Sequence, residues 1–125
     1  MSIEDHLRAL LAAIAATPHV VSSDVALDQR GPQSGLIRGD IFFADGSRLH
    51  FRELVDLELE PARRMYSYHY QRVDASLIFR YDDTPHYPEL PGLPHHKHDG
   101  DEQNVVAVTP PDLAAVLKEI ERLTV

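Results

Sequence analysis

The sequence predicts one α+β domain, residues 1–125, in which an antiparallel sheet of five or six strands packs against N-terminal and C-terminal helices. Apolar residues recur at helical spacing near both ends of the chain, and between them they alternate with polar residues at a period of two. The 125 residues are 43% apolar and include no cysteine. A core can therefore form without disulfides, and zinc–thiolate sites are excluded.

A helix is expected over about residues 3–16. Ser2 has the character of an N-cap, and Glu4 and Asp5 follow in the first turn, where carboxylates favour the helix dipole. One apolar stripe runs along this segment: Ile3, Leu7, Leu10, Leu11 and Ile14. The dipeptide Thr17-Pro18 ends the helix.

Three strands follow, over about residues 19–29, 36–43 and 47–56, with Val21, Val25 and Leu27 on one face of the first. Turn chemistry at residues 31–35 and at Asp45-Gly46 separates them.

The register between the second and third of these strands can be argued from their apolar faces. Matching the faces pairs Phe43 with Leu49, Ile41 with Phe51 and Ile37 with Val55, while Asp40 meets Arg52 on the other face. In this register Glu53 falls on the buried face opposite Gly39, so that its carboxylate would face a gap.

The next two strands cover about residues 63–72 and 76–82. A tight turn at Asp74-Ala75 pairs Tyr70 with Phe79 and Tyr68 with Tyr81, so that two aromatic faces coincide. The same register sets His69 opposite Arg80 on the other face.

Residues 83–104 contain four prolines and few apolar residues, which predicts a long loop. A short buried strand follows at 105–108. The last element is a helix over 110–123, with Thr109 as N-cap and Pro110 in the first helical position.

The net charge is −8, from twenty acidic and twelve basic residues, which disfavours non-specific binding to nucleic acid or anionic lipid. No apolar run is long enough to span a bilayer, and the first residues lack the pattern of a signal peptide. We therefore expect a cytoplasmic protein with no membrane partner.

The densest group of candidate functional residues lies around the predicted loop. Four of the eight histidines, His86, His95, His96 and His98, fall within it, close to Arg80 and Lys97. One interpretation is cleavage of a phosphodiester without a metal, in which histidines transfer protons and the cations stabilise charge on the phosphoryl oxygens.

Two other interpretations compete with this chemistry. His96 and His98, or His95 and His98, could hold a divalent metal such as zinc, with Asp82, Asp83 or His86 completing the shell. Alternatively, the segment is a solvated Pro/His loop or a docking surface for a protein partner.

Two further features carry structural and functional alternatives. The stripe of Tyr66, Tyr68 and Tyr70 is typical of a hydrophobic core. The alternative interpretation is a surface on which nucleobases stack. Glu53, on an apolar face, is either a salt-bridged structural carboxylate or a catalytic acid. The sequence around His6, His19 and His50 does not indicate a function for these histidines.

Five motifs together resemble a known family. They are Asp45-Gly46-Ser47-X-Leu49-X-Phe51-X-Glu53, Tyr66-Ser67-Tyr68-X-Tyr70-Gln71, Leu77-Ile78-Phe79-Arg80-Tyr81-Asp82, Pro85-His86 and Pro94-His95-His96-Lys97-His98. With the closing helix they resemble the TumE-like family, small prokaryotic proteins assigned as toxins of toxin–antitoxin modules. The resemblance covers about residues 35–98 and the closing helix, and it implies a neighbouring antitoxin that neutralises the chain by contact.

The leading hypothesis is therefore a toxin that cleaves RNA, free or ribosome-bound, as a metal-independent endoribonuclease without a cofactor. His95, His96 and His98 would transfer protons, and Arg80 and Lys97 would contact phosphate. The supporting residues would be His69, Tyr81, Glu53 and His86.

The alternative is a metal-binding or protein-interaction module without catalytic activity, using His96, His98 and Asp82 if a metal is bound. A nucleotidyl-transfer or other group-transfer toxin is a third possibility, against which no Gly-rich phosphate loop of recognised spacing is present.

Overall fold

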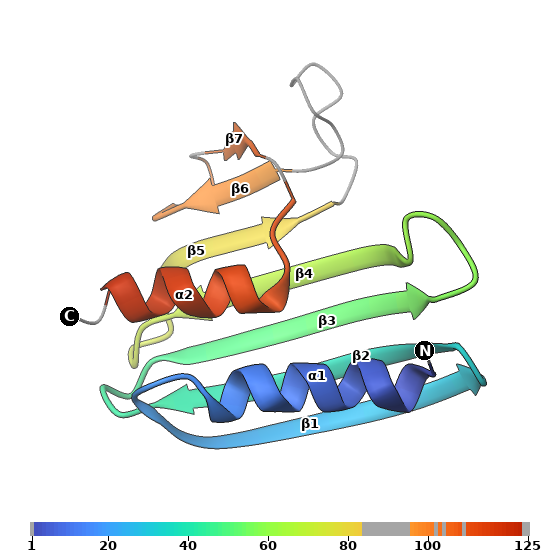
Figure 1. Cartoon of the computed structure of the whole chain (residues 1–125). Coiled ribbons are helices and arrows are strands. Elements are labelled where there is room, and N and C mark those ends of the chain that lie inside the picture. The colour runs from blue at the N-terminus through green and yellow to red at the C-terminus, as the bar shows by residue number, and fades with distance from the viewer. Residues whose placement is uncertain (1, 84–95, 102, 104, 109, 124–125) are drawn as a thin grey trace.

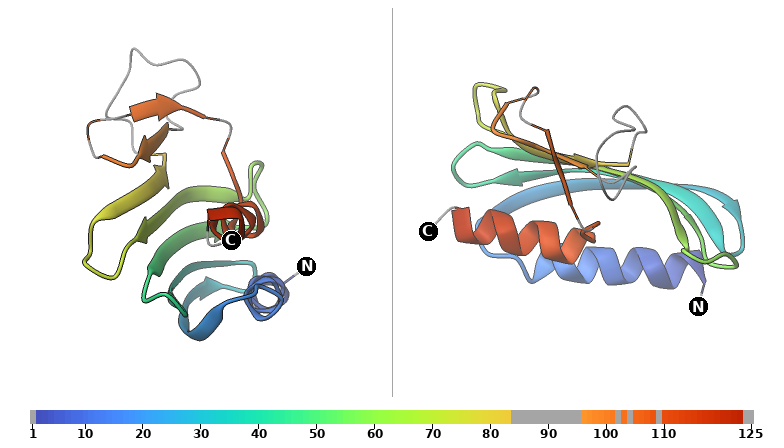
Figure 2. Two further views of the ribbon diagram at one scale, coloured as in Figure 1. Left: turned by 90° about the vertical axis from the view of Figure 1, so that its left-hand side faces the viewer. Right: turned by 90° about the horizontal axis from the view of Figure 1, so that it is seen from above.

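The computed structural model describes residues 2–83, 96–101, 103, 105–108 and 110–123. In this part of the chain, seven strands form one antiparallel sheet whose spatial order is the chain order, and both helices lie on one face of it (Figures 1 and 2). The elements are α1 (Ile3–Ala15), β1 (Val20–Gly31), β2 (Ser34–Phe43), β3 (Arg48–Asp56), β4 (Arg63–Gln71), β5 (Leu77–Asp82), β6 (His96–Asp99), β7 (Val105–Ala107) and α2 (Leu113–Leu123). The predicted α+β class is confirmed.

The core lies between the helices and the covered face of the sheet. It is built largely from alternate residues of the central strands: every second residue is buried along β2 and β3, and along β4 from Tyr66 onward. Its largest fully buried side chains are Tyr68, Tyr70, Phe51 and Phe79. The tyrosine stripe is therefore core, as its spacing indicated.

The N-terminal helix begins where the sequence placed it. Ser2 accepts a hydrogen bond from the backbone of Asp5, and the Asp5 side chain accepts one from the backbone of Ser2 in return. In the strand that follows, Val21 is 65% exposed because the register shifts between Val20 and Ser22. The expected buried position of Val21 is thus wrong.

The predicted register between β2 and β3 is also wrong, by two residues. Ile41 pairs with Leu49 and Gly39 pairs with Phe51, so Glu53 lies opposite Ile37. A shift of two keeps every side chain on its predicted face, which is why face matching alone does not distinguish the two registers.

The space above Gly39 explains the register that forms. A β-carbon at Gly39 would come within 2.7 Å of the Phe51 ring, so the ring fills the place that a side chain would take. The gap expected opposite Glu53 is filled in this way. On the other face Asp40 lies opposite His50, rather than Arg52.

The register between β4 and β5 is confirmed. Tyr70 pairs with Phe79, Tyr68 with Tyr81, and His69 with Arg80. The turn at Asp74 and Ala75 closes this hairpin, with Ala75 at φ 71° and the Asp74 side chain accepting hydrogen bonds from Ser76.

Three expectations near the C-terminus need correction. The strand expected to be buried at 105–108 is β7, and its Val106 is 41% exposed. The predicted loop 83–104 includes a strand, β6, which lacks apolar alternation but is paired on both sides, with β5 and β7.

The last helix begins at Leu113 rather than at residue 110, because Pro111 disfavours helical backbone at the residue before it. Asp112 caps this helix by accepting a hydrogen bond from Ala115 N–H at 2.8 Å. Thr109, the expected cap, lies outside the described residues.

Neither described helix has the length and hydrophobicity needed to cross a bilayer.

Candidate functional site

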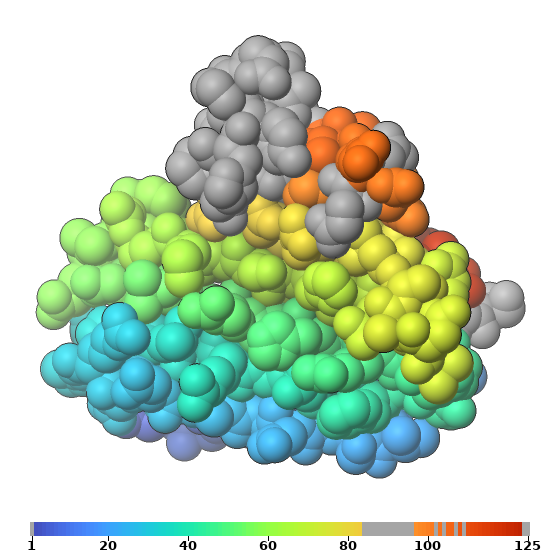
Figure 3. All heavy atoms as spheres, turned by 180° about the vertical axis from the view of Figure 1, so that it is seen from behind, coloured from blue at the N-terminus to red at the C-terminus, as the bar shows by residue number. Residues whose placement is uncertain are grey.

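The face of the sheet turned away from the helices carries a row of polar side chains that crosses five strands. Figure 3 shows this face, with the strands in colour order across it. Consecutive register partners on β2 to β6 form the row: Asp40, His50, His69, Arg80 and His98. Adjacent strands lie about 4.8 Å apart, so each side chain is a direct neighbour of the next. We call these five residues the polar row.

At one end of the polar row a carboxylate orients a histidine. His50 Nδ1 donates to Asp40 Oδ1 at 2.9 Å, and Arg48 donates to the same oxygen through Nε at 2.8 Å. Partial burial opposes ionisation of Asp40, but the hydrogen bonds from His50 and Arg48 outweigh it and lower the pKa of the carboxyl. The His50 side chain is 40% exposed, so part of the imidazole is open to solvent on this face.

Arg80 stands near the other end of the row, between two acceptors. Its Nε donates to Asp82 Oδ2 at 3.0 Å, and its Nη2 lies 2.9 Å from His98 Nε2. A guanidinium only donates, so His98 accepts through Nε2. Asp82 and His98 are both buried, at 7% and 3% exposure. The Arg80 guanidinium is therefore held in a fixed orientation beside His69.

Cationic groups continue beside the polar row. Arg38 pairs with Arg52 in the next register position, and Arg52 pairs with Ser67. A shallow pocket of about 350 Å³ lies at the β3–β5 end of this position and is lined by Arg52, Ser67, Arg80, Asp82, Asp83, Met65 and Tyr66. Three arginines, Arg38, Arg52 and Arg80, thus lie near one another on this face of a chain of net charge −8, with the carboxylates of Asp82 and Asp83 in the same pocket.

Lys97 and Tyr81 do not join this group. Lys97 Nζ donates to Glu119 Oε2 at 2.8 Å, and Tyr81 OH donates to Glu119 Oε1 at 2.6 Å. Glu119 is on α2, so both residues lie on the helix-covered face, opposite Arg80. Burial works against the charged form of Lys97, but its contact with Glu119 prevails and raises the pKa of the ammonium.

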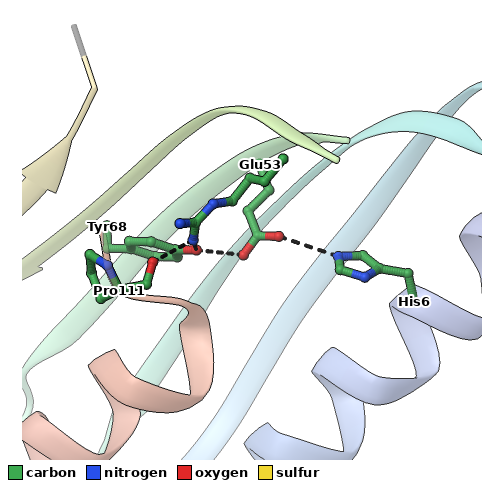
Figure 4. A network of polar contacts seen from close by, with 5 residues as sticks. His6, Glu53, Tyr68 and Pro111 are labelled. Atoms are coloured by element: carbon green, nitrogen blue, oxygen red, sulfur yellow. Dashed lines mark hydrogen bonds and ion pairs between the residues drawn. The ribbon is translucent and has the colours of Figure 1, made fainter. Parts of the chain in front are cut away.

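Glu53 forms a separate buried network on the covered face (Figure 4). Its carboxylate accepts from Tyr68 OH at 2.6 Å and lies 3.4 Å from His6 Nε2. Arg63 donates to Tyr68 OH at 2.7 Å and to the carbonyl of Pro111. Burial, together with the Glu53 carboxylate, raises the pKa of the Tyr68 hydroxyl. These contacts join α1, β3, β4 and the start of α2.

The structure thus divides the predicted site residues into groups. It brings His69, Arg80 and His98 together on the open face, and it places Lys97 and Tyr81 on one part of the covered face and Glu53 on another. The backbone of His96 pairs with Asp82, but its side chain is not described. His86 and His95 lie outside the described residues.

Sequence reasoning missed two members of the polar row, His50 and Asp40. The signal for His50 was the position of Asp40, which in the observed register lies directly opposite. The expected register assigned Asp40 to Arg52 and so hid the pair. His6, also judged uninformative, contacts Glu53.

Among the described side chains, no three His, Asp or Glu residues gather as metal ligands. This set does not include the side chain of His96, which belongs to the alternative metal site with His98 and Asp82.

Comparisons with known proteins agree with the resemblance seen in the motifs. A family model described as Toxin TumE matches residues 10–124. Searches of curated proteins and of solved structures gave no significant match. The matched segment includes every strand and the C-terminal helix, and a toxin of this kind implies an antitoxin partner. The chain belongs to the TumE toxin family.

Proposed function

We propose that this toxin acts in the cytoplasm on RNA, free or ribosome-bound, as a metal-independent endoribonuclease, with the polar row as its active site. The observation that carries the proposal is the alignment of His50, His69 and Arg80 on neighbouring strands of the open face. A cation for the phosphate and two imidazoles for proton transfer are the groups that such a reaction needs.

The arrangement suggests a role for each residue. His50, oriented by Asp40, takes the proton of a ribose 2′-hydroxyl through Nε2, and the 2′-oxygen attacks the adjacent phosphorus. The bond from phosphorus to the 5′-oxygen breaks, and protonated His69 supplies the proton that this oxygen needs. The products are a 2′,3′-cyclic phosphate and a 5′-hydroxyl, so atoms and charge balance without a further reactant.

Arg80 binds the phosphoryl oxygens, whose negative charge increases in the transition state. Its orientation depends on Asp82 and His98, which makes these two positioning residues. Lys97, Tyr81 and Glu53 do not reach this face, so we assign them to the packing of the helices. His86, His95 and His96 remain candidates for additional proton transfer.

The net charge limits how RNA can bind. At −8 the protein repels a polyanion at long range, so binding depends on the local cations Arg38, Arg52 and Arg80, or on a ribosome that presents the RNA. The expected target is therefore one positioned strand rather than RNA in bulk.

Induced expression of variants tests the roles. We expect Arg80→Gln and His50→Gln each to reduce the rate of RNA cleavage by about 100-fold or more, because each removes a group that acts in the transition state. Growth arrest should weaken accordingly. Asp40→Asn, which keeps the shape but weakens the orientation of His50, should have an intermediate effect.

Arg30→Gln is the matched control, because Arg30 is an exposed arginine on the edge strand β1, with its side chain 55% exposed. It should leave arrest unchanged. Full growth arrest by folded Arg80→Gln and His50→Gln would show that the polar row is not the active site.

A further inference from the structure

A groove runs along the seam between the two helices, on the face opposite the polar row. Its larger part is a cavity of about 470 Å³ whose walls include Ala9, Ala13, Val55, Leu57, Leu113 and Ala114. A second cavity of about 190 Å³ shares Ala13 and Ala114 with it and continues along the helices to Thr17 and Glu121. We call the two together the α1–α2 groove.

The walls of this groove are apolar because its polar groups bind one another. Glu53 and Arg63 line the larger cavity, but Glu53 is bonded to Tyr68 and His6, and Arg63 to Tyr68 and Pro111. Figure 4 shows that this network lies over the sheet, between the two helices. What remains for an occupant is mainly aliphatic surface and small alanines, which allow close approach.

The backbone chemistry of the groove favours a helix over an extended segment. Both walls are helices, whose backbone groups are bonded internally apart from their ends. An extended occupant would bury N–H and C=O groups with no partners, whereas a helix satisfies its own. The groove follows α1 from His6 to Thr17, or about 16 Å at 1.5 Å per residue, which matches about three turns of an occupying helix.

Charge gives the occupant its polar side. Asp112 stands at one end of the groove, and Glu121 stands at the other end beside Lys118, on a chain of net charge −8. A segment with basic residues beside its apolar stripe would be attracted at long range and would bind faster at low salt.

We propose that the α1–α2 groove is the docking site for an amphipathic, basic helix of the antitoxin. The inference rests on the antitoxin partner that the toxin family implies, and it is independent of the ribonuclease chemistry in the proposed function. Because the groove and the polar row lie on opposite faces of the sheet, docking there would hold the toxin without contacting the proposed active site. Neutralisation would then act through the bulk of the bound antitoxin or through a second segment of it.

Alanines on each helix provide matched pairs of variants. Ala9 and Ala114 line the groove, whereas Ala12 and Ala115, also exposed, line neither of its cavities. Ala9→Trp and Ala114→Trp would fill the groove, and Ala12→Trp and Ala115→Trp would add the same side chain elsewhere on the same helices.

Each variant is expressed alone and with the product of the neighbouring gene, and the purified proteins are titrated by calorimetry. We expect all four variants to arrest growth alone. The antitoxin should rescue cells with Ala12→Trp or Ala115→Trp, but not those with Ala9→Trp or Ala114→Trp, whose affinity should fall at least 100-fold. The calorimetry uses proteins whose thermal unfolding matches the parent, so a variant that loses toxicity still gives a result.

Rescue and unchanged affinity in the groove variants would overturn the proposal. It would also be overturned if the parent alone formed a dimer that Ala9→Trp and Ala114→Trp dissociate without weakening antitoxin binding, since the groove would then join two copies of the chain. Absence of RNA cleavage, with the same pattern of rescue, would reject the ribonuclease and leave the docking site in place.

Discussion

Asp40 shows how one residue links the stability of this protein to its proposed chemistry. Its carboxylate binds His50 and Arg48 on the open face of the sheet, with its own side chain 28% exposed. The same contacts that lower its pKa also orient the imidazole. The stability of the protein should therefore report on the ionisation of a carboxyl group within the proposed active site.

We expect Asp40→Asn to lower the free energy of unfolding by about 1–2 kcal/mol at pH 7, since the hydrogen bonds from His50 and Arg48 lose the charge of their acceptor. A carboxyl whose pKa is lowered in the folded state stabilises the protein at every pH above its ordinary pKa of about 3.9. This contribution disappears as the pH falls through the lower pKa that the carboxyl has in the folded protein. The difference in the free energy of unfolding between the parent and Asp40→Asn should thus be constant near neutral pH and should become smaller below about pH 4.

Denaturant unfolding between pH 7 and pH 2 measures this difference. Asp28→Asn, at a side chain that is 65% exposed on β1, serves as the control and should change little. A difference that persists unchanged at pH 2, or none at pH 7, would contradict the role given to Asp40.

Among the elements, α2 and β6 depend on each other through one carboxylate. Glu119 on α2 binds Tyr81 on β5 and Lys97 on β6, and the Lys97 side chain is only 15% exposed. Because β6 is four residues long and its outer neighbour β7 three, this contact is a principal attachment of that side of the sheet to the helical layer.

Removal of the carboxylate in Glu119→Ala should lower the free energy of unfolding by about 2 kcal/mol, because the partly buried Lys97 ammonium and Tyr81 hydroxyl lose this partner. We also expect faster hydrogen exchange at the amides of β6, measured by mass spectrometry alongside denaturant unfolding. Glu58→Ala, an exposed carboxylate between β3 and β4, is the matched control. Unchanged stability and unchanged exchange in β6 would show that the strand is held by its backbone pairing alone.

The elements also show what sequence reasoning could reach. The register of β4 and β5 was predictable, because a tight turn and two aromatic faces agree on one pairing. That of β2 and β3 was not, because a shift of two residues matches the faces equally well and the choice depends on Phe51 packing over Gly39. Strand β6 was missed because its residues show no apolar alternation.

The same reasons decide how much of the site was predictable. His69 and Arg80 were placed together because the register of their strands was right. His50 was overlooked because the misplaced register separated it from Asp40. Lys97 and Arg80 were assigned to one cluster, since proximity in sequence does not tell which face of a sheet a side chain occupies until the strand is recognised.

At the scale of the whole molecule, the sheet separates two surfaces with different chemistry. Both helices lie on one face of the sheet, and the other face is not covered by a helix (Figures 2 and 3). The open face carries the polar row and its neighbouring arginines, and the helical face carries the apolar groove. In our proposals, this separation lets one chain of net charge −8 bind RNA on one face and an antitoxin helix on the other.

Mapping RNA ends in growth-arrested cells tests the central claim, that the polar row cleaves RNA, most directly. Expression of the parent should create new 5′-hydroxyl ends with matching 2′,3′-cyclic phosphates, and Arg80→Gln at equal protein level should create few. The purified parent should form the same ends on ribosome-bound RNA treated with a chelator selective for transition metals. Growth arrest without new RNA ends, or ends that are equally abundant with Arg80→Gln, would contradict the account.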